Sequence, residues 1–206
     1  GWVDAFWTRG LGAAGVGVAV AAGPGFKSIL TASAVGLWAL RLGLYIANRS
    51  RGGHEDVRYA NFRREWGDQF ETRLFVFLQI QALAATLLLV PIALAAASPR
   101  PFGIADIAAI VVLIVAVGGE AAADRQLHAF RSDPNNRGKV CDRGLWGLSR
   151  HPNYFFEWLH WFCYPLLAIG GDWGWVALIG PAFMYWLLAH VSGVPPLEAQ
   201  MLKSRG

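Results

Sequence analysis

The chain alternates between long apolar stretches and polar connections. Each apolar stretch approaches the ~20 residues that a helix needs to cross a bilayer. The stretches lie at 5–22, 28–47, 74–97, 104–122, 153–170 and 174–191. Short turn-like linkers such as "ASPRPFG" join some of them, whereas the connections 48–73 and 123–152 are longer and polar. The pattern predicts an all-α, polytopic integral-membrane bundle of six to seven transmembrane helices, forming one domain over residues 1–206.

Composition and charge support a membrane location. The chain is 55% hydrophobic and 16% charged, with a mean hydropathy of +0.37, which excludes an ordinary soluble domain. Its cations concentrate in the two long connections and in the tail "LKSRG". The positive-inside rule therefore places these segments in the cytoplasm.

Two classes of partner are not expected. Acidic residues interrupt the basic ones in "RREWGDQFETR", so that segment does not form the continuous basic surface that binds nucleic acid. The cysteines, Cys141 and Cys163, show no metal-ligand spacing and are not expected to form a disulfide. We predict no nucleic-acid partner and no metal.

The stretch "GLSRHPNYFFEWLHW" places polar residues within an apolar segment. Pro152 suits the first turn of a helix, and Arg150 and His151 come just before it. A helix N-terminus presents free backbone amides and favours an anion such as phosphate. The polar positions that follow, at i, i+4, i+7 and i+11, lie on one helix face and are Asn153, Glu157, His160 and Tyr164.

Two interpretations of this face stay open. Ionisable groups inside a membrane are costly, so they are candidates for function, and here they would bind a polar ligand that enters from the cytoplasm. The alternative is a polar network that the helices satisfy among themselves.

A second polar set lies near the end of the stretch 28–47. Trp38, Arg41, Tyr45 and Asn48 follow helical spacing, and Arg49 is adjacent. Arginines here would grip a phosphorylated cofactor by bidentate hydrogen bonds. The alternative is a cytoplasmic anchor with an aromatic belt.

The segment "GLGAAG", residues 10–15, fits the dinucleotide fingerprint G-x-G-x-x-G. No strand precedes it and it lies within an apolar stretch, so we predict close helix packing through small residues.

The segment "GLWGLSRHPNYFFEWLHW" resembles a signature of the steroid 5α-reductase family, particularly its bacterial multispan members, and of the related sterol C14- and C7-reductases. The resemblance is strong from Glu120 to Glu198 and weaker from Asp4 to Arg51. Isoprenylcysteine methyltransferases share the R-H-P-x-Y core but bind S-adenosylmethionine.

The resemblance implies a bundle of about seven spans that holds NADPH in a cytoplasm-facing cavity, with the family's first span lying outside this sequence. The implied activity is that of a 3-oxo-5α-steroid 4-dehydrogenase, which reduces the C4=C5 bond of 3-oxo-4-ene steroids or of a similar enone lipid. The resemblance to bacterial members also implies a protein of the bacterial inner membrane. We expect a monomer in contact with membrane lipid.

The resemblance also implies roles for individual residues. Asn153 and Glu157 match contacts to the nicotinamide half of the cofactor, and Asp124 and Arg131 match contacts to its adenosine-phosphate half. The full set of implied cofactor-binding residues is Arg41, Tyr45, Asn48, Arg49, Asp124, Arg131, Arg150, His151, Asn153, Tyr154, Glu157 and Glu198.

The implied substrate pocket contains Asp4, Trp38 and Trp161. Asp4 falls where relatives place an acid facing the substrate ketone, whereas Trp38 stands where a steroid reductase has a tyrosine. Asp4 and Tyr45 are the candidate catalytic donors to the ketone oxygen, where negative charge develops. A carboxyl group in an apolar site can stay protonated and donate.

Two other functions remain alternatives. One is an S-adenosylmethionine-dependent carboxyl methyltransferase of the isoprenylcysteine type. The other is a non-enzymatic membrane transporter or scaffold, although no internal repeat of the transporter kind stands out. The many arginines near the cytoplasmic side favour a ligand with a 2′-phosphate, which S-adenosylmethionine lacks.

Overall fold

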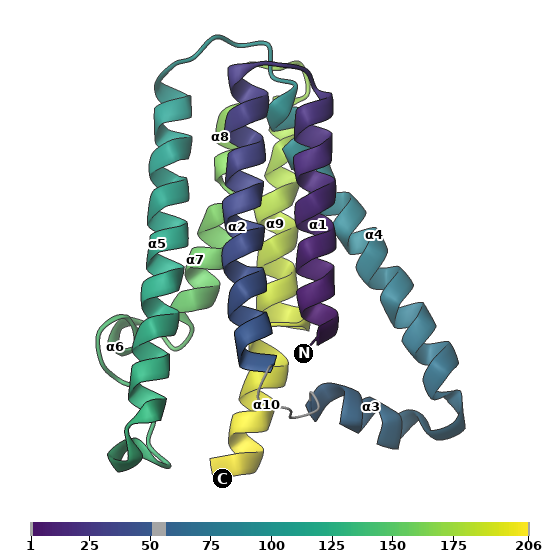
Figure 1. Cartoon of the computed structure of the whole chain (residues 1–206), viewed down its shortest axis with the longest axis vertical. Helices are drawn as coiled ribbons and strands as arrows, with labels where there is room; N and C mark the ends of the chain where they lie inside the picture. The colour runs from purple at the N-terminus through teal and green to yellow at the C-terminus, as the bar shows by residue number, and fades with distance from the viewer. Residues whose placement is uncertain (1, 51–56, 206) are drawn as a thin grey trace. The chain divides into compact units, whose positions relative to one another are not determined.

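A computed structural model describes residues 2–50 and 57–205, with side chains described at 5–47, 60–199 and 202. Every element in the described ranges is helical (Figure 1). In chain order the elements are α1 (Trp2–Ala21), α2 (Phe26–Ser50), α3 (Val57–Trp66), η1 (Gly67–Gln69), α4 (Phe70–Ala96), α5 (Ile104–Ser132), η2 (Pro134–Asn136), α6 (Leu145–Leu148), α7 (Pro152–His160), α8 (Cys163–Ala168), η3 (Gly174–Leu178), α9 (Ile179–Trp186), η4 (Leu187–Val191) and α10 (Val194–Arg205).

The all-α membrane fold predicted from the sequence is confirmed. Within the described residues, four helical segments are long and apolar enough to cross a membrane, namely Phe26–Ala47, Ala60–Ala96, Ile104–Ser132 and Gly174–Ala199. The other two predicted stretches are helical but shorter. The stretch 5–22 contributes the apolar helix Ala5–Ala21, and 153–170 is divided between α7 and α8.

The chain divides into two compact units, Gly1–Ala97 and Ser98–Gly206. That residues 1–206 form a single domain stays a prediction. Both cysteines, Cys141 and Cys163, are buried and free.

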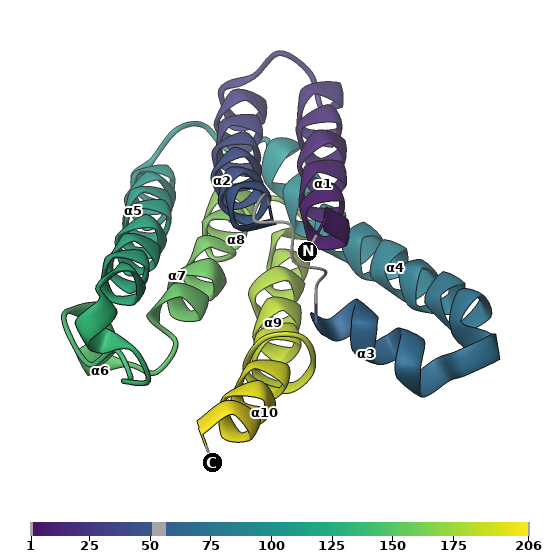
Figure 2. The same ribbon diagram turned by 60° about the horizontal axis from the view of Figure 1, so that its bottom comes forward.

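In the first unit, α1 and α2 pack side by side through small residues (Figures 1 and 2). A Cβ atom on Gly12 would overlap the Ala39 side chain, and one on Gly15 would lie 2.8 Å from Cγ1 of Val35. Only glycine allows this approach at these two positions. The interpretation of "GLGAAG" as a helix-packing segment is therefore confirmed.

Helix α4 packs against α1 and α2 through its second half. Leu88, Ile92 and Ala95 are at most 1% exposed, whereas Phe75 and Leu83 in the first half are 62% and 70% exposed. The first half leans away from α1, and the short helix α3 precedes it in the chain (Figures 1 and 2). The apolar side chains of this half suit lipid contact.

In the second unit, α5 is ten residues longer than its apolar stretch, which ends at residue 122. Residues 123–132, "ADRQLHAFRS", are polar but include good helix formers, so the helix continues beyond the apolar segment. It ends before Pro134, whose ring disfavours helical geometry at Asp133. The prediction that a polar connection begins at residue 123 is wrong, and Asp124 and Arg131 lie on this helix.

Helices α7 and α8 pack along α5. Gly119 of α5 lies beneath the ring of Phe156, where any Cβ atom would overlap the ring. The indole nitrogen of Trp158 donates to the backbone oxygen of Pro181 at 3.0 Å and so connects α7 to α9.

The start of α5 explains a buried acid. Asp106 is 0% exposed, accepts a hydrogen bond from the Gly103 backbone N–H at 2.8 Å, and pairs with the Arg100 guanidinium at 3.0 Å. Arg100 also donates to the backbone oxygen of Ile169 at 2.8 Å. The acid therefore caps the helix N-terminus and joins it to the end of α8.

We expect Asp106→Ala to destabilise the second unit. The change leaves a largely buried arginine and an unsatisfied helix N-terminus, and breaking such a pair costs roughly 3 kcal/mol. Thermal unfolding in detergent should show a clearly lowered midpoint. Asp172→Ala is the matched control, because Asp172 is exposed. Equal midpoints for the two variants would contradict this role of Asp106.

Candidate functional site at the start of α7

The segment that leads into α7 is held against α5. The indole nitrogen of Trp146 donates to the backbone oxygen of Ala123 at 2.8 Å, and the Leu145 backbone N–H donates to the Gln126 side-chain oxygen at 2.9 Å. Gly144 has a φ of 58°, and a Cβ atom there would lie 2.7 Å from that same Gln126 oxygen. The turn therefore needs glycine for both its backbone conformation and its space.

At the start of α7, four predicted cofactor residues come together. His151 is the N-cap and Pro152 occupies the first turn, as the sequence predicts. The His151 ring stacks on Tyr154 with centroids 5.6 Å apart. Its Nε2 lies 3.4 Å from Oε1 of Glu198, which comes from α10, near the end of the chain. The Arg150 guanidinium lies 3.9 Å from the same oxygen and is 88% exposed, so that pair is weak.

Two polar groups here are open to a ligand. Nδ1 of His151 is buried and has no hydrogen-bond partner within the described part of the chain. The half-buried side-chain amide of Asn153 also forms no hydrogen bond with any described residue. A buried polar group without a partner costs about 1–3 kcal/mol, so such groups usually meet a ligand or water.

The carboxylate of Glu157 lies one helical turn beyond Asn153. Glu157 is 6% exposed, and its Oε1 accepts a hydrogen bond from the Trp161 indole at 3.2 Å. Trp161 itself is 0% exposed. The indole of Trp161 therefore orients the Glu157 carboxylate. The role of Trp161 in substrate binding stays a prediction.

The predicted single polar face does not continue as one helix. Helix α7 ends at His160, and α8 begins only at Cys163, so Tyr164 belongs to the next helix. His160 Nε2 and the Tyr164 hydroxyl nevertheless lie 2.8 Å apart, and both residues are at most 1% exposed. These two residues support the interpretation of a polar network that the helices satisfy among themselves. Asn153 and His151 do not belong to it.

On α5, Asp124 and Arg131 are separated by seven residues and so share one face. Asp124 is 6% exposed, whereas Arg131 is exposed in the last turn. Helix α5 packs against α7, and its second half holds the segment before α7 in place. An exposed arginine in this position is free to meet a phosphate.

In the first unit, α2 carries the second predicted set. Trp38 is 2% exposed, and the Arg41 guanidinium lies over the Tyr45 ring at 5.5 Å from its centroid. This cation–π contact orients the phenol. The side chains of Asp4, Asn48 and Arg49 lie outside the described residues.

Three positioning residues were not anticipated from the sequence. Gly144 and Trp146 stand inside the quoted signature, which was a usable signal. Gln126 had no such signal in the sequence, because its contact with Leu145 spans 19 residues and depends on how α6 folds back onto α5. Among the residues with described side chains, no three His, Cys, Asp or Glu residues form a group that could hold a metal ion.

Comparisons with known proteins agree with the resemblance at the family level. A family model, DUF1295, described as a protein of unknown function, matches residues 1–206. No curated protein and no solved structure matches the chain significantly. The chain belongs to the DUF1295 family, a steroid 5α-reductase-like family.

Proposed function

We propose that this protein is an NADPH-dependent reductase that saturates a conjugated C=C bond of a membrane-embedded enone lipid, with a 3-oxo-4-ene steroid as the model substrate. The supporting observation is the start of α7, where the open amide of Asn153 lies one turn before the buried carboxylate of Glu157. An amide and a carboxylate together match the donor and acceptor groups of a nicotinamide carboxamide.

The surroundings fit the charged half of the same cofactor. The N-terminus of α7 has free backbone amides, and the unpartnered His151 Nδ1 adds a polar contact beside it. Exposed Arg150 and Arg131 offer guanidinium groups. Arginine forms bidentate bonds to phosphate, which favours NADPH over NADH because only NADPH carries a 2′-phosphate.

When bound, NADPH supplies a hydride. The residues of this chain would bind the nucleotide, keep water out and stabilise the negative charge that develops on the substrate's carbonyl oxygen. A protonated Asp4 is the first candidate donor to that oxygen, and the Tyr45 hydroxyl is the second. In this proposal Trp38 contributes apolar surface to the substrate.

We expect NADPH to bind much more tightly than NADH. Loss of the 2′-phosphate removes charge-assisted hydrogen bonds worth about 1.5–3 kcal/mol each, so the dissociation constant should rise at least about tenfold. Calorimetry on the detergent-purified protein measures both constants, with S-adenosylmethionine as the third ligand. Equal affinities for the two nucleotides would contradict the proposal, and tight binding of S-adenosylmethionine alone would favour the methyltransferase.

Glu157→Gln should weaken NADPH binding or slow reduction while the protein still folds. Glutamine keeps the oxygen that accepts from Trp161 but replaces the other carboxylate oxygen with a donor. Binding should weaken about tenfold, as expected for the loss of a hydrogen bond to a charged group. Glu71→Gln, an exposed change in α4, is the control. Normal affinity and normal turnover in Glu157→Gln would leave Glu157 a structural role only.

Substitutions at Asp4 test the donor. Asp4→Ala should lower turnover of a 3-oxo-4-ene steroid by ~10²–10³, the usual cost of one oxyanion donor. Asp4→Asn keeps an N–H donor and should lose less, and NADPH affinity should stay the same in both. Asp68→Ala, which changes an exposed acid, is the control. Full turnover in both Asp4 variants would exclude Asp4 and pass the role to Tyr45.

A further inference from the structure

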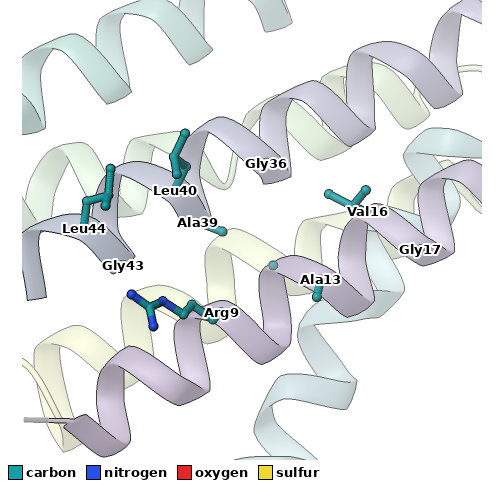
Figure 3. A pocket seen from close by; sticks show the side chains of 10 residues that line it. Arg9, Ala13, Val16, Gly17, Gly36, Ala39, Leu40, Gly43 and Leu44 are labelled. Atoms are coloured by element: carbon teal, nitrogen blue, oxygen red, sulfur yellow. The ribbon is translucent and has the colours of Figure 1, made fainter. Parts of the chain in front are cut away.

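A groove of about 580 Å³ lies between α1 and α2 (Figure 3). Ala13, Val16 and Gly17 line it from α1, and Gly36, Leu40 and Leu44 line it from α2. These residues offer apolar side chains or no side chain at all. Leu40 and Leu44 are 60% and 50% exposed, so the groove has an apolar rim on the outer surface of the unit.

Glycine creates the hollow. Gly12 brings α1 close to α2 at Ala39, which closes the bottom of the groove. A Cβ atom on Gly17 would meet nothing within 4 Å, and one on Gly36 would make only an ordinary contact with Val16 at 3.8 Å. Gly17 therefore borders open space, and neither glycine is tightly packed against the facing helix. A Cβ atom fits at both positions without displacing the helices.

Arg9 is the charged residue of the groove lining. Its side chain crosses from α1 toward α2, where a Cβ atom on Gly43 would lie 3.6 Å from Cγ of Arg9 (Figure 3). Arg9 is exposed and forms no hydrogen bond or ion pair with any described residue. An arginine within a membrane-spanning bundle normally has an anionic partner or reaches the headgroup region.

The position of Arg9 along α1 suits the headgroup region. It lies seven residues after the start of the helix, about 10 Å along the axis, on the side predicted to face the cytoplasm. From Arg9 to Gly17 the groove runs a further eight residues, about 12 Å, toward the middle of the bilayer. A cation at the interface followed by an apolar channel matches a phosphate followed by an acyl chain.

We propose that this groove binds an anionic membrane phospholipid, with the lipid phosphate on Arg9 and one acyl chain along Gly17 and Gly36. Charge complementarity selects this occupant. An apolar helix of a second copy would fill the groove but leave the guanidinium without an anion, which is unfavourable at membrane depth. The site differs from the nucleotide site proposed at α7 and does not depend on it.

Photolabelling tests the proposal. The full chain is reconstituted in phosphatidylcholine vesicles that contain a trace of phosphatidylglycerol with a diazirine on its acyl chain, and the labelled residues are mapped by mass spectrometry. Label should concentrate within residues 9–17 and 36–44. Phosphatidylcholine with the same diazirine should label these segments about tenfold less, because it lacks the net negative charge that Arg9 attracts.

Substitutions separate the groove from general lipid contact. Gly17→Leu and Gly36→Leu fill the open space and should remove most of the label. Gly10→Leu is the matched control on α1, because Gly10 is also exposed with nothing within 4 Å of its Cβ position but does not line the groove. Arg9→Gln should lower labelling by phosphatidylglycerol about tenfold, Arg9→Lys much less, and the exposed-cation control Arg64→Gln not at all.

Four results would overturn the proposal. Equal labelling by both lipids would mean ordinary bilayer contact, and labelling unchanged in both leucine variants would place the lipid elsewhere. Displacement of the label by a 3-oxo-4-ene steroid would make the groove a route for substrate. Crosslinked dimers joined through residues 9–17 would make it an interface between copies. Thermal unfolding of each variant checks that it is folded, so that its labelling can be compared with that of the unchanged protein.

Discussion

The absence of water in the bilayer interior is the constraint on which the rest of this structure depends. Every backbone amide and every polar side chain there needs an internal partner, which is why the described spans are helices. The same requirement sorts the polar side chains by what they contact. Asp106 meets a helix N-terminus and Arg100, and His160 meets Tyr164. Polar groups that lack such a partner are the ones that point to a ligand.

The candidate nucleotide site begins at an irregular stretch of backbone between α5 and α7. Three features bring the start of α7 next to Glu198 of α10: the turn at Gly144, the short helix α6 packed against α5, and the N-cap residue His151. Helix termini leave backbone groups unsatisfied, so an irregular junction offers hydrogen bonds that the middle of a span cannot. The regular helix beyond it then presents Asn153 and Glu157 one turn apart. Irregular backbone followed by regular helix is what places the candidate anion site beside a buried carboxylate.

Glycine has two opposite uses on α1. At Gly12 and Gly15 the missing side chain lets α2 approach, which packs the first unit. At Gly17 the missing side chain leaves space that the facing helix does not fill. The difference is one of helix face, because residues on the facing side meet Ala39 and Val35, while those turned away open toward the rim. Close packing thus creates the groove that begins at Arg9.

The order of apolar and polar stretches by itself determined the helical membrane fold, because crossing a bilayer needs a length of apolar helix that is visible without any tertiary contact. Local spacing likewise predicted that Pro152 begins a helix with Asn153 and Glu157 on one face. The end of α7 at His160 also has a local cause, because Pro165 has no N–H to donate to the backbone oxygen of Trp161 and so disfavours one continuous helix. Only tertiary structure brought Glu198 to His151 across 47 residues, because long-range pairing depends on how helices pack and leaves no periodic trace in the chain.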